Sequence, residues 1–269
     1  MGFLDHVKKF LSLDGTAKAG PTNDSSSAYH LSSELRLHAR YFVLTSDLAS
    51  LEIAATVAKG HIKDLSYGGI LADFKESWLQ NPLIADQKSI EAKLTFLDQS
   101  AQVFVQVVHE KNGGQTVGLS FIHKNIETLV FLRDILENLR IGSTFSSLDP
   151  AHTKDKYNVS GQSIYRGDGP SDLQITEIDG YIQNILLTFR SGSSYFELKM
   201  VNDVLTTARS KNEDQKVASQ MEPSPDGVDI TILRNATQLI LGFLSTHPKS
   251  KMLQLLPKLY KELYRRESK

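Results

Sequence analysis

One short stretch with two-residue periodicity constrains the fold of this chain more than any other feature. Residues 103–110 place β-branched Val at every second position from 103 to 107, and residues 116–122 follow as a second strand-like run. Between them lies the turn sequence Lys111-Asn112-Gly113-Gly114. Asn and Gly tolerate the positive φ of tight turns, and a period of two is typical of a strand with one buried face. The stretch therefore predicts a β-hairpin and, with it, an antiparallel sheet.

Further short runs predict the rest of a sheet that is closed by a helix. The expected strands upstream of the hairpin are residues 41–45, 53–64, 69–73 and 90–97. Residues 78–86 contain a proline and predict an inserted loop or helical turn. Residues 125–140 carry apolar side chains at helical spacing, and Gly142 is the expected end of that helix. We therefore expect a barrel-like sheet with a closing helix to be complete near residue 142.

The second half of the chain predicts a smaller sheet followed by helices. After a turn-rich start, the strand-like runs form an expected three-stranded meander: residues 173–178, 181–190 and 195–201. Residues 210–227 hold few apolar side chains and two prolines, and they predict a mobile linker or long loop. Two helical apolar stripes, interrupted at His247-Pro248, predict a helical hairpin: residues 228–246 and 251–267.

The expected fold class is mainly β, and α+β overall, with three parts along the chain. These parts are an amphipathic helix with a flexible linker (1–31), a barrel domain (32–142) and a C-terminal domain (157–269). Within the C-terminal domain we expect a β-meander (165–209), a linker (210–227) and helices (228–267). The N-terminal amphipathic helix is expected to dock on its own protein, with a membrane surface or a partner as the alternative.

The composition excludes several classes of function. The 269 residues include no cysteine, and 30 basic and 31 acidic side chains give a formal net charge of -1. The lack of cysteine excludes disulfides and thiolate chemistry, and the balanced charge predicts no direct nucleic-acid partner. No apolar run approaches the roughly 18 residues that cross a bilayer, and a secretory signal pattern is lacking. We expect a cytoplasmic protein without a transmembrane segment.

Two short polar motifs stand near the two ends of residues 34–73. The first, Arg36-Leu37-His38-Ala39-Arg40, carries two arginines four residues apart, a spacing that is frequent on exposed helices. The second, Asp64-Leu65-Ser66-Tyr67-Gly68-Gly69, lies at the end of an expected strand. A spacing of two puts Asp64 and Ser66 on the same face of that strand. The two glycines remove side chains where the backbone must turn or approach a ligand.

Together, these R-x-x-x-R and D-x-S-x-x-G patterns, followed by the hairpin and the helix, resemble the PilZ domain family. The resemblance covers roughly residues 32–141, whereas residues 157–269 resemble no family that we recognise. It implies a six-stranded antiparallel β-barrel and a bacterial receptor for cyclic di-GMP. It also implies the ligand-binding residues Arg36, Arg40, Asp64, Ser66 and Gly69, with Gly68 as an adjoining loop residue.

The residue types agree with such a ligand. Guanidinium groups form charge-assisted, often bidentate bonds with phosphodiesters, and they also pair with guanine O6 and N7 or stack on the base. Asp64 can accept from the guanine N1–H and N2–H groups, and Ser66 can add a hydroxyl bond. Because Leu35 rather than a basic residue precedes Arg36, the sequence leaves open whether one nucleotide or an intercalated dimer binds.

The expected function is that of a non-enzymatic cyclic di-GMP receptor that relays a conformational change to an unidentified protein partner through its C-terminal region. Motility, biofilm or polysaccharide control would be the output. No cofactor and no metal site are expected, because the eight histidines are scattered and zinc, Walker-type and nucleophile-elbow motifs are lacking. Two alternatives stay open: a scaffold with a non-binding PilZ-like barrel, and an enzyme that acts on phosphodiesters through its C-terminal half.

Overall fold

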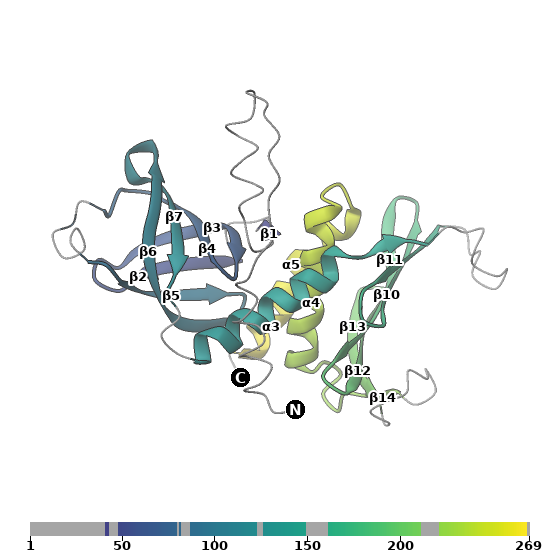
Figure 1. Cartoon of the computed structure of the whole chain (residues 1–269). Coiled ribbons are helices and arrows are strands. Elements are labelled where there is room, and N and C mark those ends of the chain that lie inside the picture. Colours follow the sequence, from purple (N-terminus) through teal and green to yellow (C-terminus); the bar gives the residue numbers. More distant parts are fainter. Residues whose placement is uncertain are drawn as a thin grey trace, which may run out of the picture. The chain divides into compact units, whose positions relative to one another are not determined.

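The computed structural model describes most of the chain from residue 41 onward: residues 41–42, 48–79, 81, 87–122, 126–148, 161–210 and 221–267. These residues belong to one compact unit, His38–Lys269. The unit contains an antiparallel barrel, a second antiparallel sheet and helices that contact both (Figure 1). The expected fold class, mainly β and α+β overall, is confirmed. The amphipathic helix and linker expected at residues 1–31 lie outside the described residues.

Six strands close the barrel within the described residues. They follow one another in the order β3, β2, β5, β6, β7 and β4, and β4 completes the ring by pairing with β3. A further short strand, β1 (Tyr41–Phe42), pairs with the end of β3. The barrel strands are β2 (Ala49–Ile53), β3 (Ala58–Ser66), β4 (Gly69–Phe74), β5 (Ile90–Phe96), β6 (Gln99–Lys111) and β7 (Thr116–Phe121).

The strand expected at residues 53–64 is wrong in its first part. Ile53 ends β2, and a turn follows in which Val57 N donates to Ile53 O at 2.8 Å. Val57 has a φ of 56°, a left-handed conformation that β-branched residues rarely adopt. The turn therefore carries none of the Gly, Asn or Pro signals by which turns are found in a sequence.

The hairpin predicted at residues 103–122 is confirmed. Strands β6 and β7 pair on either side of the 3₁₀ turn η1 (Asn112–Gly114), in which Asn112 and Gly113 have φ of 53° and 64°. The segment between β4 and β5, expected as an inserted loop, also contributes to the core. Trp78 is 4% exposed, and its ring centroid lies 5.3 Å from that of Phe74. Residues 80 and 82–86 of this segment lie outside the described part.

Helix α3 (Ile126–Ser143) follows the barrel and is bonded to it, since Thr128 Oγ1 donates to Gln102 O of β6 at 2.9 Å. The helix runs through Gly142, so the expectation that Gly142 ends it is wrong. A Cβ added to Gly142 would lie 2.0 Å from Leu239 O of helix α4 (Ile230–Thr246). Gly142 is therefore a packing position and not a helix terminator.

The matching glycine on α4 is Gly242. A Cβ added there would lie 2.2 Å from Leu139 O and 2.9 Å from the Cα of Gly142. The backbones of α3 and α4 are thus in direct contact at two glycines, one on each helix. This allows the two helices to pack more closely than side chains would permit.

The second sheet has seven antiparallel strands in chain order within the described residues. They are β8 (Ser146–Ser147), β9 (Gln162–Gly167), β10 (Ser171–Ile178), β11 (Tyr181–Ser191), β12 (Ser194–Val201), β13 (Val204–Ser210) and β14 (Met221–Pro223). The expected three-stranded meander is therefore too small. Strand β9 uses residues that read as turns, and β14 lies inside the expected linker at 210–227. Residues 211–220 of that linker lie outside the described part.

Helix α4 packs against the face of this sheet that holds its apolar residues. Phe243 of α4 is fully buried, and its ring centroid lies 5.0 Å from that of Tyr165 on β9. The 3₁₀ turn η5 (Lys251–Leu255) and helix α5 (Leu256–Glu267) follow, so the predicted helical hairpin with its break at His247-Pro248 is confirmed. None of the helices in the described residues is long and apolar enough to cross a membrane.

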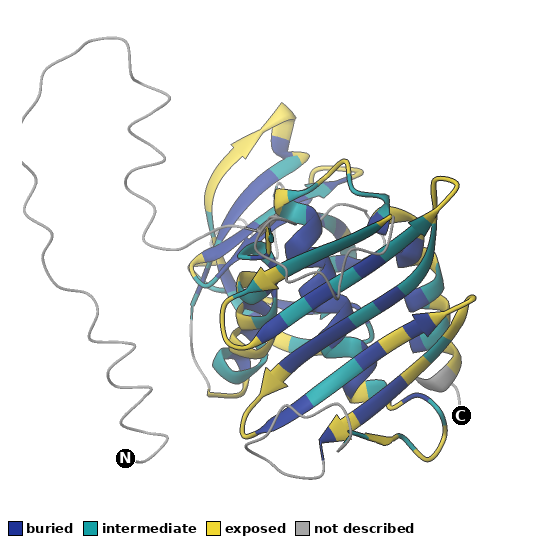
Figure 2. Ribbon diagram, turned by 90° about the vertical axis from the view of Figure 1, so that its right-hand side faces the viewer, coloured by how far each residue is buried: buried dark blue, intermediate teal, exposed yellow. Residues whose placement is uncertain are grey.

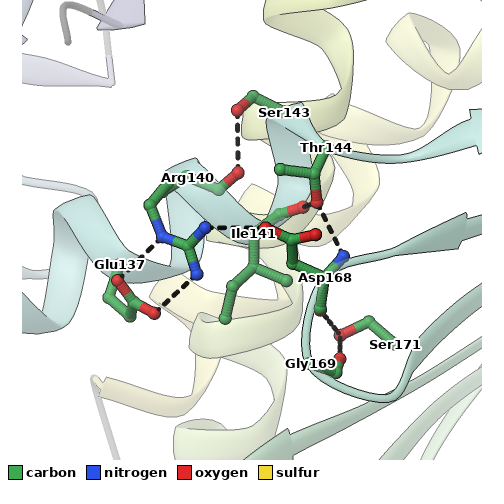
Figure 3. A network of polar contacts seen from close by, with 8 residues as sticks. All are labelled: Glu137, Arg140, Ile141, Ser143, Thr144, Asp168, Gly169 and Ser171. Atoms are coloured by element: carbon green, nitrogen blue, oxygen red, sulfur yellow. Dashed lines mark hydrogen bonds and ion pairs between the residues drawn. The ribbon is translucent and has the colours of Figure 1, made fainter.

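The end of α3 is bonded to the turn between β9 and β10 (Figure 3). Arg140 donates to Asp168 Oδ2 at 2.9 Å, and the Asp168 N–H donates to Thr144 Oγ1 at 2.8 Å. Arg140 also bonds Glu137 on its own helix. The helix that begins against the barrel is therefore joined to the second sheet at its other end.

The opposite face of the second sheet is turned to the viewer in Figure 2. Exposed residues are frequent at the ends of its hairpins (Figure 2). At strand ends next to these turns, the apolar side chains of Ile178, Tyr181 and Val204 are 53%, 67% and 63% exposed.

Candidate functional site

The second polar motif lies on β3 directly after a β-bulge. The register of β3 against β4 shifts between Ile62 and Asp64, so that Lys63 is the extra residue. Ile62 is in the core, and regular alternation would also turn Asp64 inward. After the bulge, Leu65 takes the core position, and Asp64 and Ser66 share the outer face of the barrel. Both side chains are nevertheless buried there, with exposed fractions of 4% and 3%.

Ser66 stabilises the turn that joins β3 to β4. Its Oγ accepts a hydrogen bond from Gly69 N and donates one to Gly69 O, each at 3.2 Å. Since the single hydroxyl proton is directed at Gly69 O, the oxygen keeps acceptor capacity for a ligand N–H group. At the tip of the turn, Gly68 O accepts from Phe121 N at 3.0 Å. The turn is therefore bonded to the last residue of β7.

Gly69 permits a close approach of two backbones. It pairs with Ser120 of β7, and a Cβ added to it would lie 2.1 Å from Leu119 O. No side chain fits in that space, because real Cβ atoms do not approach a carbonyl oxygen so closely. The motif glycine at this position thus has a structural cause, the contact between β4 and β7, whether or not a ligand also lies against it.

The two arginines of the first motif, Arg36 and Arg40, lie outside the described residues. Strand β1 begins at Tyr41, the residue that follows Arg40 in the chain. In its register with β3, Tyr41 lies opposite Leu65 and Phe42 lies opposite Asp64. The end of the first motif is therefore connected covalently to a strand that pairs with the residues of the second.

An ion pair lies on the same outer surface as Asp64. The bulge residue Lys63 places its Nζ 2.6 Å from Asp73 Oδ2, and Thr116 Oγ1 donates to Asp73 Oδ1 at 2.8 Å. Partial burial acts to raise the pKa of Asp73, but the hydrogen bonds from Lys63 and Thr116 outweigh it and lower that pKa below its ordinary value. Asp64 on β3 and Asp73 on β4 are therefore two carboxylates on the same outer surface, and the bulge residue Lys63 is paired with Asp73.

These groups are suited to hydrogen bonding with the edge of a base. The described part of the site offers one carboxylate, one hydroxyl oxygen and a glycine turn at the end of a single strand. No group of three or more His, Cys, Asp and Glu side chains in the described residues is placed to hold a metal ion. The role of Lys63 cannot be predicted from the sequence, because an extra residue in a strand leaves no periodic signal of its own.

Two comparisons with known proteins were negative. No protein-family model matches the chain, and the comparison with curated proteins finds no match. The interpretation of the site therefore rests on its own residues and on the resemblance of its two motifs to those of PilZ domains.

Proposed function

We propose that the barrel is a receptor for cyclic di-GMP. The observation that carries the proposal is the bulge at Lys63, which turns Asp64 and Ser66 to the outer face beside the strand that follows Arg40. The closed six-stranded barrel supports the proposal as well, since the resemblance to PilZ domains implies this architecture. The proposed binding residues are Arg36, Arg40, Asp64 and Ser66, with Gly68 and Gly69 forming the turn.

The chemistry of recognition follows from these residue types. Arg36 and Arg40 pair with the phosphodiesters or with guanine O6 and N7, and Asp64 accepts from the guanine N–H edge. Each charge-assisted bond contributes roughly 1.5–3 kcal/mol, so loss of either arginine weakens binding at least about tenfold. Lysine is a poor replacement at both positions because it lacks the planar fork of donors.

The receptor acts without catalysis in a bacterial cytoplasm and passes the signal to a protein partner through its C-terminal region. Motility, biofilm formation or polysaccharide secretion is the output. Support comes from two sets of contacts: Gly68 O bonds Phe121 N at the end of β7, and α3, the next described element of the chain, touches α4 at Gly142 and Gly242. A change at the turn is expected to reach the C-terminal helices by way of β7 and α3.

Calorimetric titration of the whole chain with cyclic di-GMP tests the proposal. The arginine double variant, Arg36→Ala with Arg40→Ala, and Asp64→Ala are expected to lose most of the binding. Asp73→Ala is the matched control, because Asp73 is a carboxylate on the same outer surface that lies outside the motif, on β4, where it bonds Lys63 and Thr116. Equal binding by the wild type and the double variant would refute the proposal.

The burial of Asp64 and Ser66 favours one other candidate, a scaffold whose barrel binds no nucleotide. Side chains with 4% and 3% exposure must be uncovered before a ligand reaches them. For such a scaffold, the protein partner is recruited equally with and without cyclic di-GMP. Partner recruitment that depends on the nucleotide would exclude this candidate.

A further inference from the structure

A second bulge lies on β6, which flanks the β4–β7 pair on the side opposite to β3. The register of β6 against β7 shifts between Val107 and His109, so that Val108 is the extra residue. Val105 is fully buried, and regular alternation would turn Val107 and also His109 toward the core. After the bulge His109 instead pairs with Gly118 on the outer surface, where it is exposed. Bulges that redirect a side chain are over-represented at functional sites.

The two redirected side chains lie in one row across the barrel. Asp64 pairs with Leu71 on β4, Leu71 pairs with Gly118 on β7, and Gly118 pairs with His109 on β6. Neighbouring strands are about 4.8 Å apart, so this row is about 14 Å long between its end residues. The bulges at Lys63 and Val108 therefore turn a carboxylate and an imidazole outward at the two ends of the same row.

Small residues occupy the outward positions at the end of β7 and the start of β4, whereas Leu71 of β4 lies within the row between Gly118 and Asp64. Gly69 and Gly118 both occupy outward positions, and Ser120 lies opposite Gly69. The imidazole of His109 extends over the backbone of β7, since a Cβ added to Gly118 would lie 2.1 Å from His109 Cε1. Glycine at this position thus leaves room for the ring over the backbone of β7, and His109 is exposed there.

We propose that His109 is a further ligand-binding residue, which stacks on the base of the nucleotide that lies farther from Asp64. This inference rests on the proposed function and extends its site from β3 across β4 and β7 to β6. A ligand with two guanines has two base edges to place, and the row offers a recognition group at each end. Stacking on an imidazole does not depend on the hydrogen-bonding groups of the base. At the other end of the row, Asp64 accepts hydrogen bonds from the N–H groups of guanine.

Titration of the full-length chain with cyclic di-GMP tests the inference. His109→Ala is expected to weaken binding about tenfold, within the range for loss of one base-stacking partner. His109→Phe keeps a stacking ring and is expected to bind within about threefold of the wild type. Val108→Ala changes the other side chain of the same bulge, and its binding is expected to equal that of the wild type.

The possible outcomes separate this inference from the proposed function. If Asp64→Ala loses binding while His109→Ala does not, His109 is no binding residue and the receptor function stands. If the wild type binds no cyclic di-GMP, both fall.

A second readout covers the case in which His109→Ala fails to fold. The imidazole proton resonance of His109, assigned as the signal missing from His109→Phe, is expected to shift on addition of cyclic di-GMP to the wild type. A resonance that stays in place at saturation would overturn the inference.

Discussion

Arg234 of α4 binds Asp98 in the turn between β5 and β6 in a bidentate manner, through its Nε and one terminal amino group. Its Nε lies 2.8 Å from Asp98 Oδ1, and an NH2 group donates to Oδ2. The Asp98 side chain is fully buried and that of Arg234 is 17% exposed. In the same turn Leu97 O accepts from the Tyr264 hydroxyl of α5 at 3.4 Å. The turn between β5 and β6 is therefore bonded to both C-terminal helices, α4 and α5.

Breaking this pair on one side is expected to destabilise the protein strongly. Arg234→Ala leaves the carboxylate of Asp98 buried without its partner, and such changes cost about 3–5 kcal/mol. Urea unfolding, followed by circular dichroism, measures the loss. The matched control is Arg133→Ala, which removes an exposed arginine from its pair with Asp134 and is expected to cost less than about 1 kcal/mol. Equal losses in the two variants would contradict the role assigned to the pair.

Because α3 and α4 are in contact at two glycines, a Gly→Ala substitution there is expected to destabilise the protein, which is the reverse of its usual effect in a helix. In an exposed helix Gly→Ala stabilises by about 1 kcal/mol, but at Gly142 the new Cβ meets Leu239 O. Gly142→Ala is therefore expected to destabilise by about 1–3 kcal/mol. The double variant with Gly242→Ala is expected to lose less than the sum, because the first substitution already separates the helices. Chemical denaturation of the three variants checks both statements, and a stabilised Gly142→Ala would refute the first.

Gly69 is expected to matter for stability as well as for binding. Gly69→Ala forces β4 away from Leu119 O, so the variant is expected to unfold at a lower urea concentration even without ligand. Ser66→Ala removes the two hydrogen bonds within the turn and is expected to cost about 1 kcal/mol. Urea unfolding of the ligand-free variants measures both. Unchanged stability of Gly69→Ala would contradict the structural role of this glycine in the contact between β4 and β7.

The stability of the second sheet is expected to depend on pH through Glu197 on β12. Burial raises its pKa above the ordinary value of 4.5, although Lys199 acts to lower it. The native state therefore prefers the protonated carboxyl, and this contribution is complete below about pH 4.5 and lost as the pH rises through the folded-state pKa. Glu197→Gln is expected to be more stable than the wild type at pH 7, with the difference vanishing near pH 4. Thermal unfolding across this range measures it, and a pH-independent difference would contradict the assignment.

Local patterns made part of this structure predictable. The turn at Asn112 and the alternation on both sides of it fix a hairpin, because strand periodicity and positive φ are properties of neighbouring residues. Asp64 and Ser66 share a face because they are two residues apart on one strand, and helix spacing located α4 and α5. Short edge strands such as β8 and β14 carry too few residues for a periodic signal.

The rest depends on contacts between distant parts of the chain. Gly142 reads as a helix end in the sequence, and its contact with Gly242 follows only from the crossing of two helices. The bulges at Lys63 and Val108 decide which side chains face outward, although both residues resemble ordinary strand residues. The bond between Arg234 and Asp98 joins residues 136 positions apart, which no local pattern indicates.

Isothermal titration of the wild-type chain and of Asp64→Ala with cyclic di-GMP decides whether the barrel is a receptor for this nucleotide. We expect saturable binding by the wild type and at least about tenfold weaker binding by Asp64→Ala, with both proteins folded in a parallel thermal unfolding experiment. Absence of binding by the wild type at about 100 μM ligand, or equal affinity of the two proteins, would contradict it.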